Sequence, residues 1–101
     1  MAPGEHACET ETSLGLALFP EKIHMDKAVA PREAPIKLKS LTADYVSFAR
    51  PLDRVSDTTG MGDPTRATPE KGRKLVEAFV DRVATLLKEL SDAEVTDAFP
   101  Y

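Results

Sequence analysis

The chain has 101 residues and carries 13 basic against 17 acidic side chains, which gives a net charge of −4 at pH 7. This length allows one domain at most, and a hydrophobic content of 42% excludes a generic disordered acidic tail. The acidic balance argues against unaided binding of nucleic acid or of an anionic membrane surface, because both favour a net basic protein face.

A single cysteine cannot form an internal disulfide, which suits a reducing compartment. No apolar run approaches the roughly 18 residues of a membrane-spanning helix. The sequence therefore predicts a soluble, cytoplasmic protein without nucleic-acid or membrane partners.

The first predicted element is a short helix over residues 13–19. A polar, acidic stretch that starts at Gly4 leads into an apolar segment, which Pro20 ends. Thr12 or Ser13 could cap the helix, since hydroxyl side chains accept hydrogen bonds from free amides at a helix start.

Residues 20–67 lack helical spacing and are predicted to be loops with short strands. Residues 36–39 alternate between apolar and polar side chains, and residues 45–48 do so less strictly. Residues 58–64 contain two glycines and a proline and indicate a tight turn.

A long helix over residues 69–90 is the clearest structural prediction, and residues 91–101 form a tail. Thr68 can cap this helix, Pro69 suits its first position and Glu70 its first turn. Charged residues, among them Lys71, are expected on a solvated face. The apolar stripe consists of Leu75, Val76, Phe79, Val80, Val83, Leu86, Leu87 and Leu90.

That stripe needs a large apolar surface to cover it, typically a sheet, because a helix gains most of its stability from tertiary packing. One short helix and two short strands cannot provide such a surface. We therefore expect the sheet to lie in another polypeptide or in a part of the protein outside this sequence.

Chemistry-bearing side chains cluster near residue 6, and two hypotheses for them are weak. A metal site of His6, Glu9 and Glu11 is disfavoured, because on a helix His6 and Glu9 share a face while Glu11 lies about 200° further round from Glu9. A charged helix start explains the carboxylates better. A Cys8–His6 nucleophilic dyad lacks an orienting third group and an oxyanion hole, so Cys8 is better explained as a small apolar residue under the helix start.

A third hypothesis makes His6 a general acid or base, since an imidazole can accept and release a proton near neutral pH. Glu5, or another carboxylate, could hold the protonated ring. Without further support, a histidine among carboxylates is more often an ordinary surface residue.

Two motifs change this balance. Residues 6–13 read His-Ala-Cys-Glu-Thr-Glu-Thr-Ser, and residues 59–64 and 67–72 read Thr-Gly-Met-Gly-Asp-Pro and Ala-Thr-Pro-Glu-Lys-Gly. The first motif resembles the His-Ala-Gly-Glu-x-Glu-Thr-Ser signature of the creatininase (creatinine amidohydrolase) family. The second resembles that family's entry to its last helix. Cys8 stands where the family usually has glycine.

The resemblance implies that His6 moves protons during hydrolysis and that Glu5 is the acidic residue beside it. It also implies that Glu11 supports the catalytic residues without contacting the substrate. It implies a divalent metal cofactor, zinc or manganese. The Glu-x-His and Asn-Gly-His motifs that bind metal in the family do not occur in this sequence. We therefore expect no metal ligands from this chain.

Together these observations predict an α/β fold class, with residues 1–101 as the C-terminal portion of a creatininase-type layered fold that has a long C-terminal helix and few strands. The expected function is part of an amidohydrolase that cleaves a C–N bond in a cyclic amide or similar small molecule, inactive alone. Its partner would be a completing N-terminal half or further copies in a homo-oligomer. The alternative is a non-catalytic remnant or an interaction subunit completed by another chain.

Overall fold

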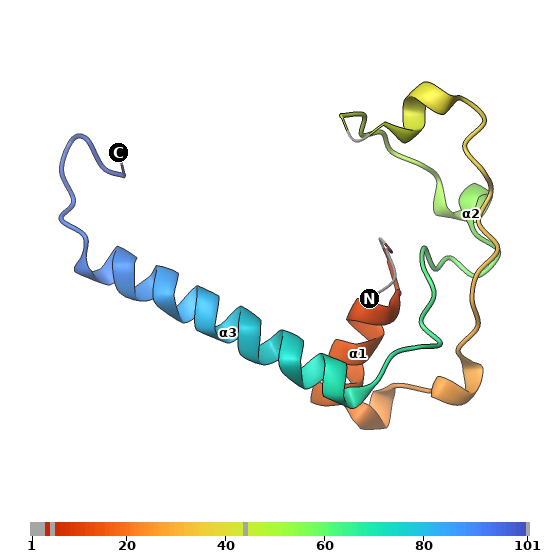
Figure 1. Cartoon of the computed structure of the whole chain (residues 1–101), viewed down its shortest axis with the longest axis horizontal. Helices are drawn as coiled ribbons and strands as arrows, with labels where there is room; N and C mark the ends of the chain where they lie inside the picture. The colour runs from red at the N-terminus through yellow and green to blue at the C-terminus, as the bar shows by residue number, and fades with distance from the viewer. Residues whose placement is uncertain (1–3, 5, 44, 101) are drawn as a thin grey trace.

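The structure, a computed structural model, describes residues 4, 6–43 and 45–100. The chain has an open shape (Figure 1), with a radius of gyration of 18.4 Å. A compact domain of this length has a radius of gyration of about 13 Å. The elements in order are α1 (Glu9–Leu18), the 3₁₀ turns η1 (Pro20–Lys22), η2 (Met25–Lys27) and η3 (Lys39–Thr42), α2 (Leu52–Val55) and α3 (Pro69–Asp92).

Helix α1 begins four residues before the predicted start, because Cys8 rather than Thr12 or Ser13 is its N-cap. Glu11 completes a capping box by accepting a hydrogen bond from the Cys8 amide at 3.4 Å. The helix ends at Leu18, and Pro20 opens η1 shortly afterwards.

The predicted strands at residues 36–39 and 45–48 are wrong, since the described residues there form no strand and η3 begins at Lys39. A strand needs a neighbour to satisfy its backbone amides and carbonyls, and this chain offers none there. Two isolated antiparallel bridges are present among the described residues, His6 with Met61 and Glu33 with Ser56.

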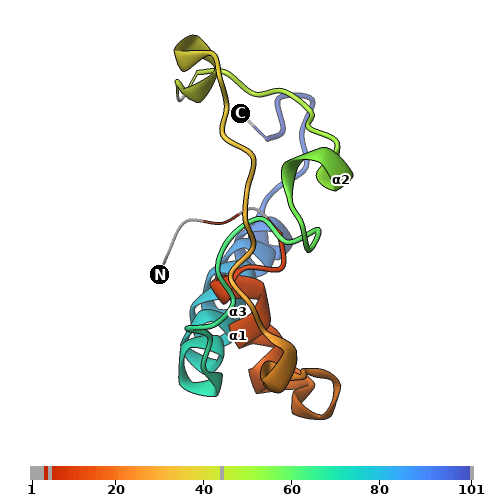
Figure 2. The same ribbon diagram turned by 90° about the vertical axis from the view of Figure 1, so that its right-hand side faces the viewer.

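Residues 28–60, here called the arm, extend away from α1 and α3 (Figure 2). The two sides of the arm are joined at its base. The Ala34 amide donates to the Val55 carbonyl at 2.6 Å, and Arg32 forms an ion pair with Asp57 at 3.0 Å. The far end of the arm contains η3.

Helix α3 starts as its sequence predicts and ends two residues later. The Thr68 hydroxyl accepts the Lys71 amide at 3.2 Å, and Pro69 takes the first helical position. The first turns of α3 cross α1, and Gly72 lies against Ser13 at the crossing.

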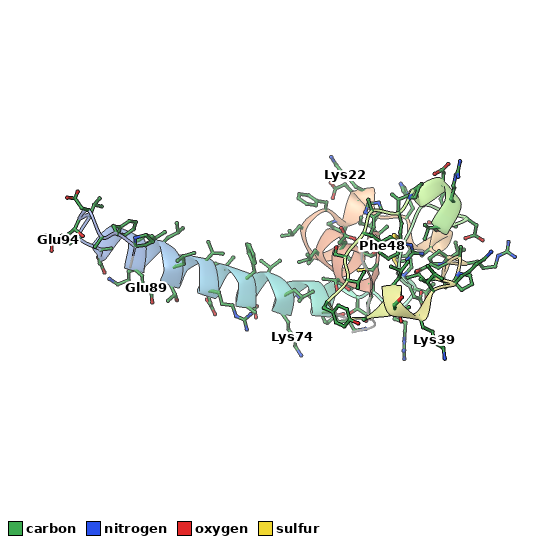
Figure 3. The ribbon with its side chains drawn as sticks, turned by 90° about the horizontal axis from the view of Figure 1, so that it is seen from above. Lys22, Lys39, Phe48, Lys74, Glu89 and Glu94 are labelled. Carbon is green, nitrogen blue, oxygen red and sulfur yellow. The ribbon has the colours of Figure 1, made fainter. Side chains whose placement is uncertain are left out.

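Beyond that crossing, α3 runs out from the rest of the chain, and Lys74 and Glu89 point to the same side (Figure 3). Most of the apolar stripe stays exposed: the exposed fraction is 69% for Phe79 and 59% for Leu87. The buried apolar residues gather instead near the crossing and the base of the arm, and they are Cys8, Val55, Met61 and Ala67. None of the helices in the described ranges combines the length and the apolar content that crossing a bilayer requires.

Candidate functional site

His6 lies exposed on a loop whose main chain is fixed at both hydrogen-bonding groups. Its amide donates to the Met61 carbonyl at 3.1 Å, and the Met61 amide donates to the His6 carbonyl at 2.7 Å. This bridge brings the two sequence motifs together although 55 residues separate them. The imidazole therefore projects from an anchored backbone.

The backbone around this bridge has positive φ at three positions: 50° at Ala7, 63° at Thr59 and 119° at Gly62. Residues with a Cβ rarely adopt such angles, so Ala7 and Thr59 each cost about 1 to 3 kcal/mol, whereas Gly62 adopts its angle without strain. Strained backbone of this kind concentrates at active sites and ligand-binding loops. Its concentration on both sides of the bridge marks the His6 loop as the candidate site.

Cys8 is buried at 5% exposure and forms the N-cap of α1. Among the described residues, no hydrogen bond joins Cys8 to His6, which is exposed. The structure therefore gives no support to a Cys8–His6 dyad and agrees with Cys8 as a small residue under the helix start.

Glu9 and Lys71 form an ion pair that joins the two motifs. The Glu9 side chain is 4% exposed, and the Lys71 ammonium also donates to the Arg66 carbonyl at 2.6 Å. The Ser13 hydroxyl accepts the Thr68 amide at 3.2 Å a little further along the same interface. These contacts fix α1, and with it the loop that precedes α1, against the start of α3.

The expectation that Lys71 lies on a solvated face is thus wrong, since Lys71 is half-buried against Glu9. Sequence reasoning also missed that Glu9 is buried. The signal that could have found the pair is the presence of one acidic and one basic residue at fixed places in the two motifs.

Glu11 is exposed and its carboxylate faces the Cys8 amide, so the contact that the structure gives it is a helix cap. Glu5 lies outside the described residues. A role of either carboxylate in catalysis remains a prediction.

No group of three His, Cys, Asp or Glu side chains in the described ranges could hold a metal ion. The one hypothetical set in this region is divided, because Glu9 pairs with Lys71 while Glu11 caps α1. The residues that the structure describes therefore do not fit a metal by themselves.

Asp63 lies between the Met61 bridge and α3. Its Oδ1 atom accepts the Thr65 hydroxyl at 2.6 Å and the Thr65 amide at 2.8 Å. These two hydrogen bonds hold the pKa of the Asp63 carboxyl below its ordinary value of 3.8, with a smaller contribution from Arg66. Asp63 therefore stays ionised at neutral pH and closes the turn into α3.

A pocket of about 180 Å³ adjoins the His6 loop. Its lining includes the strained residue Ala7, the glycines Gly60 and Gly62, and Pro31 and Lys27. Lys27 was not singled out by its sequence, because no local pattern distinguishes it from other surface lysines.

Comparison with known proteins agrees with the motifs. Residues 1–87 match the family model described as Creatininase: Creatinine amidohydrolase. The chain is 37% identical over 78 residues to a mycofactocin precursor peptide peptidase of Mycobacterium tuberculosis and 36% identical over 78 residues to that of Mycobacterium ulcerans. Each alignment covers 75% of this chain and 29% of the relative.

Among solved structures, the chain is similar to a protein of Bacteroides fragilis NCTC 9343 that is provisionally assigned as a creatinine amidohydrolase. The TM-score is 0.84 at 29% identity, and the match covers 93% of this chain and 37% of that chain. The predicted fold class is confirmed: the chain is a portion of the creatininase fold, and its long helix and scarcity of strands agree with the C-terminal portion.

The chain thus spans about a third of the length of the proteins it matches. On the family match over residues 1–87, the chain belongs to the creatininase (creatinine amidohydrolase) family.

Proposed function

We propose that this chain provides the proton-transfer side of a creatininase-type amide hydrolase, with His6 as the group that moves the proton. Hydrolysis of an amide C–N bond requires a proton on the departing nitrogen, and a positioned imidazole can deliver it. The observation that carries the proposal is the exposed His6 on a backbone bonded twice to Met61 and flanked by strained residues. A fixed backbone limits the positions that the imidazole can reach, and positioning of a catalytic group lowers the entropic part of the barrier.

In this proposal Glu5 holds the protonated imidazole, and Glu11 fixes the helix start behind it through the Cys8 amide. Members of the family generally use a divalent metal. The described residues do not fit such an ion by themselves, so we assign its binding, whether zinc or manganese, to a complementary portion of the fold.

The proposed substrate is a small amide or short peptide. The names of the relatives support this range, since one group acts on a peptide precursor and the solved structure is assigned to creatinine hydrolysis. Both reactions break a C–N bond to a carbonyl carbon.

The complementary portion would be an N-terminal half of the fold, or further copies of the chain. The stripe of exposed apolar residues on α3, including Phe79, Val80, Leu86 and Leu87, supports a need for such a partner. The alternative function, a non-catalytic interaction subunit, rests on the same stripe, because docking alone would also require it.

A chimera separates the two functions. We would replace the matching 78 residues of the M. tuberculosis peptidase by those of this chain and measure peptide hydrolysis. If His6 transfers the proton, His6→Asn should lower kcat by about 100-fold or more. His24→Asn is the matched control, because His24 is an exposed histidine away from the Met61 bridge.

A His6→Asn chimera that is as active as its parent would refute the proposed role and favour the interaction subunit. The chain alone should show no hydrolysis with added zinc or manganese. Turnover by the chain alone, abolished in His6→Ala, would contradict our assignment of the metal to another portion.

A further inference from the structure

The pocket beside the His6 loop has the size of a binding site for a small chemical group. Its volume is about 180 Å³, and Ala7, which follows His6 directly, is part of its lining. A protein cavity of about 150 Å³ can hold a benzene molecule. The pocket therefore accommodates a fragment of about six non-hydrogen atoms.

The shape of this pocket depends on backbone with positive φ. Ala7 and Gly62 line it and both have positive φ, and Gly60 lines it next to Thr59, the third residue with positive φ. The two hydrogen bonds between the main chains of His6 and Met61 hold this backbone in place. The same two bonds therefore support both the pocket wall and the loop that carries the imidazole. A group bound in the pocket would thus lie at a set position relative to the backbone of His6.

Lys27 is the one charged residue in the lining of this pocket among the residues that the structure describes. It ends η2, whose 3₁₀ turn is closed by the Ala28 amide donating to the Met25 carbonyl at 3.2 Å. Lys27 takes part in none of the ion pairs found in the described ranges. Its ammonium group is therefore available to an anionic ligand.

We infer that this pocket binds a carboxylate of the substrate, with Lys27 as the counter-charge. That the ligand is a substrate rests on the proposed function, whereas binding of a carboxylate rests on the pocket alone. A carboxylate suits the site because an ammonium forms its strongest hydrogen bonds with anionic oxygen. The substrate would accordingly be an amide with a free carboxylate near the bond to be cleaved, such as the C-terminal part of a short peptide.

The test compares two probes of nearly equal size and shape, the negatively charged N-acetylglycine and the neutral N-acetylglycinamide. Saturation-transfer NMR would measure their dissociation constants with the full chain, because the method observes the probe and tolerates self-association of the protein. We expect the acid to bind about three- to tenfold more tightly than the amide. Lys27→Gln should abolish this preference, and Lys27→Arg should keep it.

Lys22→Gln is the matched control, because Lys22 is an exposed lysine at the end of the neighbouring turn η1 and does not line the pocket. It should leave the preference for the acid unchanged. Equal binding of both probes, binding of neither, or a preference that survives Lys27→Gln would overturn the inference.

The readout is binding and needs no turnover, so the two proposals can fail separately. If His6→Asn leaves the chimera fully active while the chain still prefers the acid probe, the proposed function is refuted and the carboxylate site stands. If His6→Asn inactivates the chimera but the chain shows no preference for the acid probe, the carboxylate site is refuted and the role of His6 stands.

Discussion

Gly72 of α3 lies directly over the main chain of Ser13 in α1. A Cβ atom at Gly72 would be 1.9 Å from the Ser13 carbonyl oxygen and 2.8 Å from the Ala17 Cβ. Backbone atoms cannot move aside as the end of a flexible side chain can. The glycine of the second motif therefore sets the distance at which the two helices cross.

Gly72→Ala should destabilise the chain by about 1 to 3 kcal/mol, although alanine is ordinarily the better helix residue, because the added methyl group overpacks the crossing. Urea unfolding followed by circular dichroism at 222 nm would measure the change. Gly15→Ala is the control in α1. Its Cβ would meet only the Ile23 side chain, which can rotate away, so the free energy of unfolding should change little.

The ion pair between Glu9 and Lys71 leads to a second prediction. Lys71→Met removes the ammonium that pairs with the buried Glu9 carboxylate, and removing one member of a buried ion pair is costly. Since Lys71 is 40% exposed and water can partly replace it, we expect a loss of about 1 to 3 kcal/mol in the free energy of unfolding. The double variant Glu9→Gln with Lys71→Met should recover part of this loss.

The control for that experiment is the exposed ion pair of Lys88 with Asp92, on successive turns of α3. Lys88→Met should cost no more than about 0.5 kcal/mol, because water screens both charges. Equal effects of Lys71→Met and Lys88→Met would contradict a structural role for the buried pair.

The same pair shows where prediction from sequence succeeds and where it stops. The start of α3 follows from Thr68, Pro69 and Glu70, whose effects are local and act within one helical turn. The burial of Glu9 depends on a residue 62 positions away, and no local pattern reveals it. The family resemblance identified both motifs but did not indicate that a charged pair joins them.

The strands expected at residues 36–39 and 45–48 failed for a related reason. Alternating apolar and polar side chains suit a strand with one face covered. A strand also needs a neighbouring strand to pair with its backbone amides and carbonyls. In the arm, Leu38 and Tyr45 remain 62% and 88% exposed, so nothing in the described chain covers that face. Local alternation was a fair description of the sequence, but the partner that would make it a strand is not among the described residues.

The turn around Asp63 leads to a prediction on pH. The Thr65 hydroxyl is the largest cause of the lowered pKa of Asp63. Thr65→Val should therefore raise that pKa toward the ordinary 3.8, as measured by NMR titration of the side-chain carboxyl. Thr58→Val is the control, because no hydrogen bond joins Thr58 to Asp63 among the described residues, and it should leave the pKa unchanged.

The sign of the linked stability effect follows from the direction of the shift. The native pKa of Asp63 lies below the value of the unfolded chain, so the contribution of the ionised carboxylate is fully present above about pH 3.8. It is lost as the pH falls through the native pKa. A stability that rises on acidification in the native chain but not in Thr65→Val would contradict this assignment.

The exposed stripe of α3 leads to the last prediction. Phe79 and Leu87 are more than half exposed, so replacing both with serine removes little buried surface and should leave helix content and the free energy of unfolding nearly unchanged. The same change should weaken association with a partner, because it removes large apolar side chains from the surface proposed to be covered.

Sedimentation velocity would compare self-association of the native and doubly substituted chains, and co-purification with an N-terminal half of a creatininase-family protein would test the heterologous partner. Lys74→Ser with Glu89→Ser, on the polar side of α3, is the matched control and should change neither. If the native chain sediments as a monomer and binds no such half, the stripe is not a docking surface, and the expectation that a partner completes the fold through α3 is wrong.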